Sequence, residues 1–200
     1  MNPDDIAIFR HARLLLLLAE AGRATPDGID AERLGIYDFL AMHPLLLARR
    51  EDDPDRLTLR LAGFDDRAIA YASPSQRFVS ARLHLTRDLT DLVGRKLVRV
   101  TAAGRIRYRL TPDGASMASQ FTAMYSQSYV TAARIVIRRT RRLSGRKLRE
   151  GLREWLTMSP DRPDQRLHPA YLLDDDDVPD APASSDPAGR PAPRRTRHEQ

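Results

Sequence analysis

Apolar residues recur at intervals of three and four along much of the first 94 residues, which is the spacing of helices that bury one face. A first helix is predicted to begin at Asn2-Pro3, because asparagine caps helices and proline suits the first helical position. We expect Gly22 to end it. A second helix is predicted over residues 31–42, with Asp30 as its cap.

A third helix is predicted to open at Ser73-Pro74 and to end at Gly94, where a left-handed residue would close it. Between the second and third helices the pattern is weaker. The charged stretch Arg49–Arg56 is interpreted as an exposed loop, with Asp52-Asp53 as loop charges. The pattern of Leu57–Phe64 fits either a short helix or a strand.

The hydrophobic period then changes to two, which indicates strands. Leu97–Val100 is predicted as one strand and Arg105–Leu110 as the next, joined by a turn at Ala102–Gly104. The second strand alternates strictly between apolar and basic residues. We therefore expect a hairpin whose apolar face, made by Leu97, Val98, Ile106, Tyr108 and Leu110, packs on the helices, while its other face is basic.

Helical spacing returns after the hairpin. Thr111 is expected to cap a helix that carries Met117 and continues as far as Tyr125. Two basic helical segments follow, at residues 128–143 and at residues 145–158, and together they form the basic helices of 128–158.

The last 42 residues differ in composition. They hold eight prolines, few aromatic residues and the acidic run Asp174–Asp177. We interpret residues 159–200 as a disordered acidic and proline-rich tail that folding does not need, and residues 1–158 as the folded domain. Tyr171-Leu172-Leu173, directly before the acidic run, is either solvated tail or a short linear motif.

The order of these elements predicts the fold class. A helix, a strand, a basic hairpin and a capped helix after Leu110-Thr111-Pro112 follow one another. This is typical of a winged helix-turn-helix domain, here with extra helices at both ends and with residues 95–110 as the wing. The sequence thus predicts a mainly α protein with a small β-hairpin.

The charge of the chain suggests a polyanionic partner. The net charge is +6, but the last 42 residues carry six arginines and nine acidic residues, so the first 158 residues carry +9. Lysine occurs only at Lys96 and Lys147, and arginine forks suit phosphates and carboxylates. The alternative is that arginine replaces lysine throughout the chain for reasons of genome composition.

Candidate nucleic-acid contacts fall in three groups. The helix before the wing offers base-reading types near its N-terminus. The wing has six basic residues and no acid over residues 95–109, which suits a phosphate backbone. The basic helices add a third group, for which a solvated helix face is the alternative. The predicted contacts are Gln76, Arg77, Arg82, Arg95, Lys96, Arg99, Arg105, Arg107, Arg109, Arg138 and Arg142.

Catalysis finds little support in the sequence. The chain has no cysteine, its five histidines are scattered, and the phosphate-binding loops, nucleophile elbows and zinc motifs of enzymes do not occur. We expect no enzyme activity, no cofactor and no metal site. No stretch approaches the length of a membrane span, and the N-terminus lacks the basic start of a secretory signal, so a soluble cytoplasmic protein is expected.

One segment carries a family resemblance. Residues Leu34–Pro44 read Leu-x-x-x-Asp-Phe-Leu-x-x-His-Pro, which resembles a signature of the middle component of ABC-three-component systems. The leucine-rich first helix, the later helix from Arg77, the Leu97-Val98-Arg99 strand and the wing also occupy corresponding places. The resemblance covers residues 1 to 157, and the arginine-rich final helices and the tail depart from it.

The resemblance implies a function by association. Such proteins are small winged-helix adaptors between an SMC-like or Rad50-like ABC ATPase and a variable effector in bacterial defence against phages and plasmids, including Lamassu-type systems. Asp38, Phe39 and Leu40 would then form a seat for a partner or the core beneath one. The adaptor is thus the first hypothesis, with DNA contacted without sequence choice. A stand-alone winged-helix transcriptional regulator is the alternative.

Overall fold

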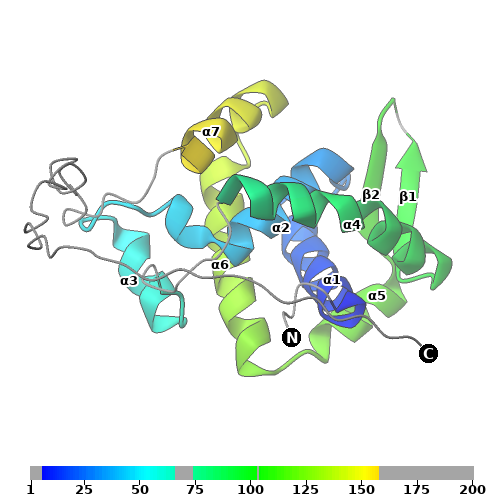
Figure 1. Cartoon of the computed structure of the whole chain (residues 1–200). Coiled ribbons are helices and arrows are strands. Elements are labelled where there is room, and N and C mark those ends of the chain that lie inside the picture. Colours follow the sequence, from blue (N-terminus) through cyan, green and yellow to red (C-terminus); the bar gives the residue numbers. More distant parts are fainter. Residues whose placement is uncertain (1–5, 66–73, 103, 158–200) are drawn as a thin grey trace, which may run out of the picture. The chain divides into compact units, whose positions relative to one another are not determined.

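The computed structural model describes residues 6–65, 74–102 and 104–157, all within one compact unit, Met1–Pro160. The predicted cap and proline at Asn2-Pro3, the predicted cap Ser73 and the predicted tail lie outside the described residues. The described chain is mainly helical with one two-stranded antiparallel sheet, as expected (Figure 1). Its elements are α1 (Ala7–Ala24), α2 (Ala31–Met42), the 3-10 helix η2 (Pro44–Leu46), α3 (Pro54–Leu61), α4 (Pro74–Gly94), β1 (Val98–Ala102), β2 (Ile106–Leu110), α5 (Pro112–Ser119), α6 (Met124–Thr140) and α7 (Gly145–Thr157).

Helix α1 lies at the centre of the packing and contacts α2, α4, α5, α6 and β2. Five consecutive leucines, Leu14–Leu18, are all buried in it. Five adjacent residues point in all directions around a helix, so burying every one requires neighbours on several sides. The apolar run therefore makes α1 the core helix of the unit.

Two helix ends differ from the prediction. Ile6 is extended and α1 runs from Ala7 to Ala24, so Gly22 does not end it. Gly94 is the last residue of α4 and does not adopt the left-handed conformation, which Lys96 takes instead, with φ 59°. The bounds of α2 are confirmed, since the Asp30 side chain accepts a hydrogen bond from the Arg33 backbone N–H at 2.8 Å.

The ambiguous stretch proves to be helical. Helix α3 begins at Pro54, and the Asp53 side chain caps it by accepting from the Asp55 backbone N–H at 2.9 Å. The interpretation of Asp53 as a loop charge is therefore wrong. A proline directly after an aspartate was the signal that defines this helix start.

The hairpin is confirmed, with Val98 paired to Leu110, Val100 to Tyr108 and Ala102 to Ile106. Only its base packs on the helices. Ile106 is 59% exposed and Val100 is 45% exposed, so the apolar face is buried near Val98 and Leu97 and open towards the turn. The prediction that Ile106 packs against helices is wrong because the hairpin extends beyond them.

The helices after the hairpin divide at another place than predicted. Thr111 caps α5 as expected, accepting from the Gly114 backbone N–H at 3.0 Å. However, α5 ends at Ser119 and α6 already begins at Met124. The break between them contains no glycine or proline, which explains why the spacing of apolar residues did not reveal it.

Buried ion pairs fix α1 to its neighbours. Arg10 donates to Asp88 of α4 at 2.7 and 3.1 Å, and Arg13 donates to Asp38 of α2 at 3.2 and 3.3 Å. The hydroxyl of Tyr129 on α6 also donates to Asp38, at 2.7 Å. Burial, and then the Asp38 charge, raises the pKa of Tyr129, so this hydroxyl keeps its proton and remains a donor.

Candidate nucleic-acid interface

One face of the hairpin carries its basic residues. Arg99 lies directly across from Arg109, and Thr101 lies across from Arg107. Residues that face each other across an antiparallel pair point to the same side, so three arginines share this face. Arg99 and Arg109 make no ion pair with any other described residue. Like charges in directly opposed positions repel, and an anion bound between them would relieve that repulsion.

The loop before α2 supports this hairpin. Ile29 and Tyr108 exchange backbone hydrogen bonds of 3.2 and 2.8 Å, and Arg107 donates to the Gly28 carbonyl at 3.1 Å. Gly28 has a φ of 90°, and a Cβ there would come within 2.7 Å of the Arg109 side chain. Arg107 is thus partly engaged by the fold, whereas Arg99 and Arg109 make no side-chain hydrogen bond or ion pair with the described residues.

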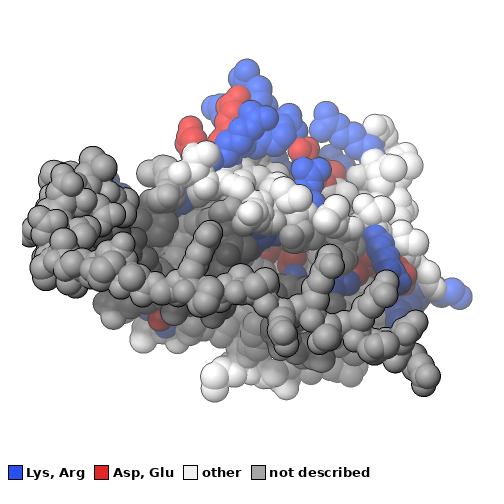
Figure 2. Space-filling model, viewed as in Figure 1, with Lys and Arg blue, Asp and Glu red and all other residues white. Residues whose placement is uncertain are grey.

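The turn of the hairpin approaches the basic residues of α7. A hollow of about 250 Å³ lies here. It is lined by Arg105, by Arg146 and Arg149 of α7, by Arg33 of α2, and by Asp30, the N-cap of α2. Figure 2 shows Lys and Arg side chains gathered over α7, with a few carboxylates among them. The structure therefore joins two basic groups that the sequence presents as separate.

Carboxylates neutralise only part of the positive charge around this hollow. Arg149 pairs with Glu32 at 2.9 Å, and Arg146 lies 3.8 Å from Glu150. Arg105 has no such partner among the described residues. The surface around Arg105 consequently keeps a positive excess.

The predicted contacts at the start of α4 lie on a separate element. Gln76 and Arg82 are exposed, Arg77 is half-buried, and the Arg82 guanidinium lies 5.7 Å from the centre of the Phe78 ring. Arg95 and Lys96 are exposed in the short link between α4 and β1.

The two contacts predicted on and after α6 differ in their surroundings. Arg142 is exposed just after α6. Arg138 donates to Asp55 of α3, and Arg139 donates to both Asp53 and Asp55, at 2.9 and 2.7 Å. These pairs attach α3 to α6, so Arg138 already has a carboxylate partner within the chain.

This α3–α6 cluster should make stability depend on pH. Hydrogen bonding by Arg139 lowers the pKa of Asp53. For Asp55, burial acts to raise the pKa, but the hydrogen bonds from Arg138 and Arg139 outweigh it and the net pKa is lowered from 3.8. The stabilisation is complete above the unfolded pKa and is lost as pH falls through the folded one.

We therefore expect the thermal midpoint of the wild type to fall as pH decreases from about 4 towards 2. In the double variant Asp53→Asn with Asp55→Asn, the thermal midpoint should be lower than that of the wild type at about pH 6. It should also fall less than the wild-type midpoint between about pH 4 and pH 2. Circular dichroism melts at each pH measure this. Parallel curves for the two proteins would contradict the assignment.

The proposed partner seat is buried. Phe39 and Leu40 are 2% and 0% exposed, and Asp38 is held by Arg13 and Tyr129 as described above. Of the two alternatives for this segment, the geometry corresponds to the core beneath the surface. The buried side chains of Phe39 and Leu40 offer little surface for direct contact with a partner.

Sequence reasoning missed two features of the structure. It counted Arg149 within the basic helices but did not place it in the same hollow as Arg105, and it took Asp53 for a loop charge. Neither could be found from spacing, because each depends on segments more than 40 residues apart. None of the helices in the described part of the chain combines the length and apolar character needed to span a bilayer.

Comparison of the chain with family models, with curated proteins and with solved structures found no match.

Proposed function

We propose that this chain is a non-catalytic, cytoplasmic winged-helix subunit that binds nucleic acid through the phosphate backbone. The hairpin β1–β2 serves as the wing. The order α1, the bridge at Ile29, α2, α4, β1 and β2 supports this interpretation, since it is the order of elements in a winged helix. Helix α3 and η2 are then additions between α2 and α4.

The observation that carries the proposal is the opposed pair Arg99 and Arg109. Two guanidinium groups on one face, without a carboxylate partner among the described residues, offer several donors to phosphate oxygens. Phosphate contacts position a protein on a duplex without reading its sequence. Binding should therefore be similar for duplexes of unrelated sequence.

The test is a double variant, Arg99→Ala with Arg109→Ala, compared by fluorescence anisotropy on two unrelated duplexes. We expect about tenfold weaker binding to both duplexes at low salt, because two phosphate contacts are lost. The matched control is Arg50→Ala with Arg60→Ala, which removes the same charge near α3, away from the hairpin (Figure 1). An equal loss in both variants would mean that only total charge matters and would refute the hairpin's role.

We further propose that the subunit acts as an adaptor between an SMC-like or Rad50-like ABC ATPase and an effector protein in antiviral defence. The resemblance of Leu34–Pro44 supports this. The tagged chain should recover both proteins when it is co-expressed with the products of its neighbouring genes. Recovery of the chain alone under the same conditions would contradict the adaptor role.

A second candidate, a stand-alone transcriptional regulator, is favoured by one observation. The outer face at the start of α4 is exposed and presents Gln76 and Arg82, which are base-reading residue types. Selection from a random duplex library distinguishes the two functions. The adaptor proposal expects no enriched sequence, whereas a regulator would enrich one and lose the preference in Gln76→Ala.

A further inference from the structure

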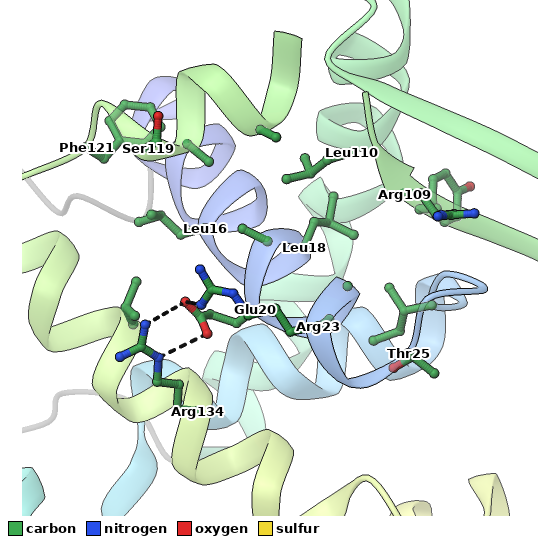
Figure 3. A pocket seen from close by; sticks show the side chains of 18 of the residues that line it. Leu16, Leu18, Glu20, Arg23, Thr25, Arg109, Leu110, Ser119, Phe121 and Arg134 are labelled. Atoms are coloured by element: carbon green, nitrogen blue, oxygen red, sulfur yellow. Dashed lines mark hydrogen bonds and ion pairs between the residues drawn. The ribbon is translucent and has the colours of Figure 1, made fainter. Parts of the chain in front are cut away.

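A groove of about 820 Å³ lies between the C-terminal half of α1, β2, α5 and the start of α6 (Figure 3). Its floor is apolar. Leu16, Leu18, Ile29 and Ala118 are buried there, and half-buried side chains such as Phe121 border it. This volume is within the range of ligand-binding pockets, which are about 300–1,000 Å³.

The rim of the groove is basic. Arg23, Arg109 and Arg134 line it, against one carboxylate, Glu20. Arg134 donates to Glu20 at 3.0 and 3.2 Å, as drawn in Figure 3, and Arg23 donates to it at 2.6 Å. Hydrogen bonding to Glu20 raises the pKa of Arg134 further, so the guanidinium stays charged. One carboxylate cannot neutralise three guanidinium groups.

The positive charge continues along α6. A smaller hollow of about 240 Å³ shares Glu20 and Arg134 with the groove and is also lined by Arg138 and Arg141. Arg141 is exposed and has no ion pair with the described residues. An apolar floor thus ends beside three arginines, of which Arg134 pairs with Glu20, Arg138 pairs with Asp55 and Arg141 keeps its charge exposed.

We propose that this groove binds a peptide segment of a partner protein in which large apolar side chains are followed directly by carboxylates. The leucine floor offers nothing to a phosphodiester backbone, so nucleic acid is a poor occupant. Apolar side chains cover the floor, and carboxylates pair with the arginine forks. This site shares Arg109 with the proposed nucleic-acid face, but its apolar floor and its lining residues Arg23, Thr131 and Arg134 lie outside that face. A substitution at Thr131 leaves Arg99 and Arg109 in place, so failure of this proposal and failure of the hairpin's role are distinguishable.

The probe is a labelled peptide with the sequence of residues 169–178, which joins Tyr-Leu-Leu to four aspartates. The protein is the full chain with Tyr171, Leu172 and Leu173 replaced by serine, so that it carries no copy of the probe's apolar residues. Fluorescence anisotropy should show saturable binding. A peptide with serine at the two leucine positions should bind at least tenfold more weakly.

The groove is altered with Thr131→Glu, which adds a carboxylate on α6 at the groove lining. We expect at least tenfold weaker peptide binding, because the new charge repels the aspartates. The matched control is Thr86→Glu on α4, an exposed position outside the groove lining, which should leave binding unchanged.

Three results would overturn the proposal. The first is no saturable binding of the peptide up to about 1 mM. The second is an equal effect of Thr131→Glu and Thr86→Glu, or equal binding of the serine peptide, since either means charge attraction alone. The third is a dimer by analytical ultracentrifugation that Thr131→Glu converts to a monomer, which would make a second copy of this chain the occupant.

Discussion

Replacing Gly114 with alanine should destabilise the protein, although a glycine-to-alanine change in a helix is normally neutral or stabilising. Gly114 lies in the first turn of α5, and a Cβ there would come within 2.0 Å of the Leu97 carbonyl oxygen. That oxygen cannot move freely, because it accepts a hydrogen bond from the backbone N–H of Thr111 at 3.0 Å. The Thr111 hydroxyl, which donates to the neighbouring Lys96 carbonyl at 2.7 Å, lies only 3.1 Å from it. The substitution therefore forces β1 and α5 apart.

We expect a loss of about 3 kcal/mol of unfolding free energy, as for an overpacked core, measured by urea denaturation. Gly94→Ala is the matched control. Gly94 ends α4, a Cβ there would have no described atom within 4 Å, and the residue does not require a left-handed conformation. Alanine there should be neutral or stabilising by less than about 1 kcal/mol. Similar losses in both variants would contradict this packing of α5 on Leu97.

Replacing Asp38 with alanine should cost about 3–5 kcal/mol. Its carboxylate receives donors from Arg13 and Tyr129, and it connects α2 to both α1 and α6. The Arg13 side chain is only 4% exposed. Removing Asp38 takes a carboxylate partner from a charge that water barely reaches, which costs more than the loss of the pair itself.

Two controls separate this effect from a general loss of charge. Tyr129→Phe removes a single hydrogen bond and should cost about 1 kcal/mol. Asp52→Ala breaks an exposed pair with Arg50 and should leave the urea midpoint unchanged. If Asp38→Ala behaved like Asp52→Ala, the buried connection between the three helices would be wrong.

Local signals in the sequence predicted the elements that begin with a capping residue or that alternate strictly between apolar and polar residues. Asp30 before α2 and Thr111 before α5 are caps with the expected hydrogen bonds, and the strict alternation of β2 identified the hairpin. No side-chain cap marks the start of α1 at Ala7 or the start of α6 at Met124. The hydrophobic pattern alone therefore placed both boundaries wrongly.

The candidate interface was predictable only in part, for the same physical reason. The basic face of the hairpin follows from the period of two within one short segment. Its approach to Arg146 and Arg149 depends on how α7 packs, which local spacing does not determine. Likewise, the pairing of Asp53 with Arg139 joins residues 86 positions apart, so a charge that looks solvated in the sequence attaches α3 to α6.

The salt dependence of duplex binding tests most directly whether the hairpin contacts the phosphate backbone. Each phosphate contact lowers the slope of log K against log salt concentration by about 0.9. With three to five hairpin residues engaged, we expect a wild-type slope of about −3 to −4.5. The variant Arg99→Ala with Arg109→Ala should lose about two units of slope, and the Arg50→Ala, Arg60→Ala control should lose none. A slope that is the same in all three proteins would contradict the account.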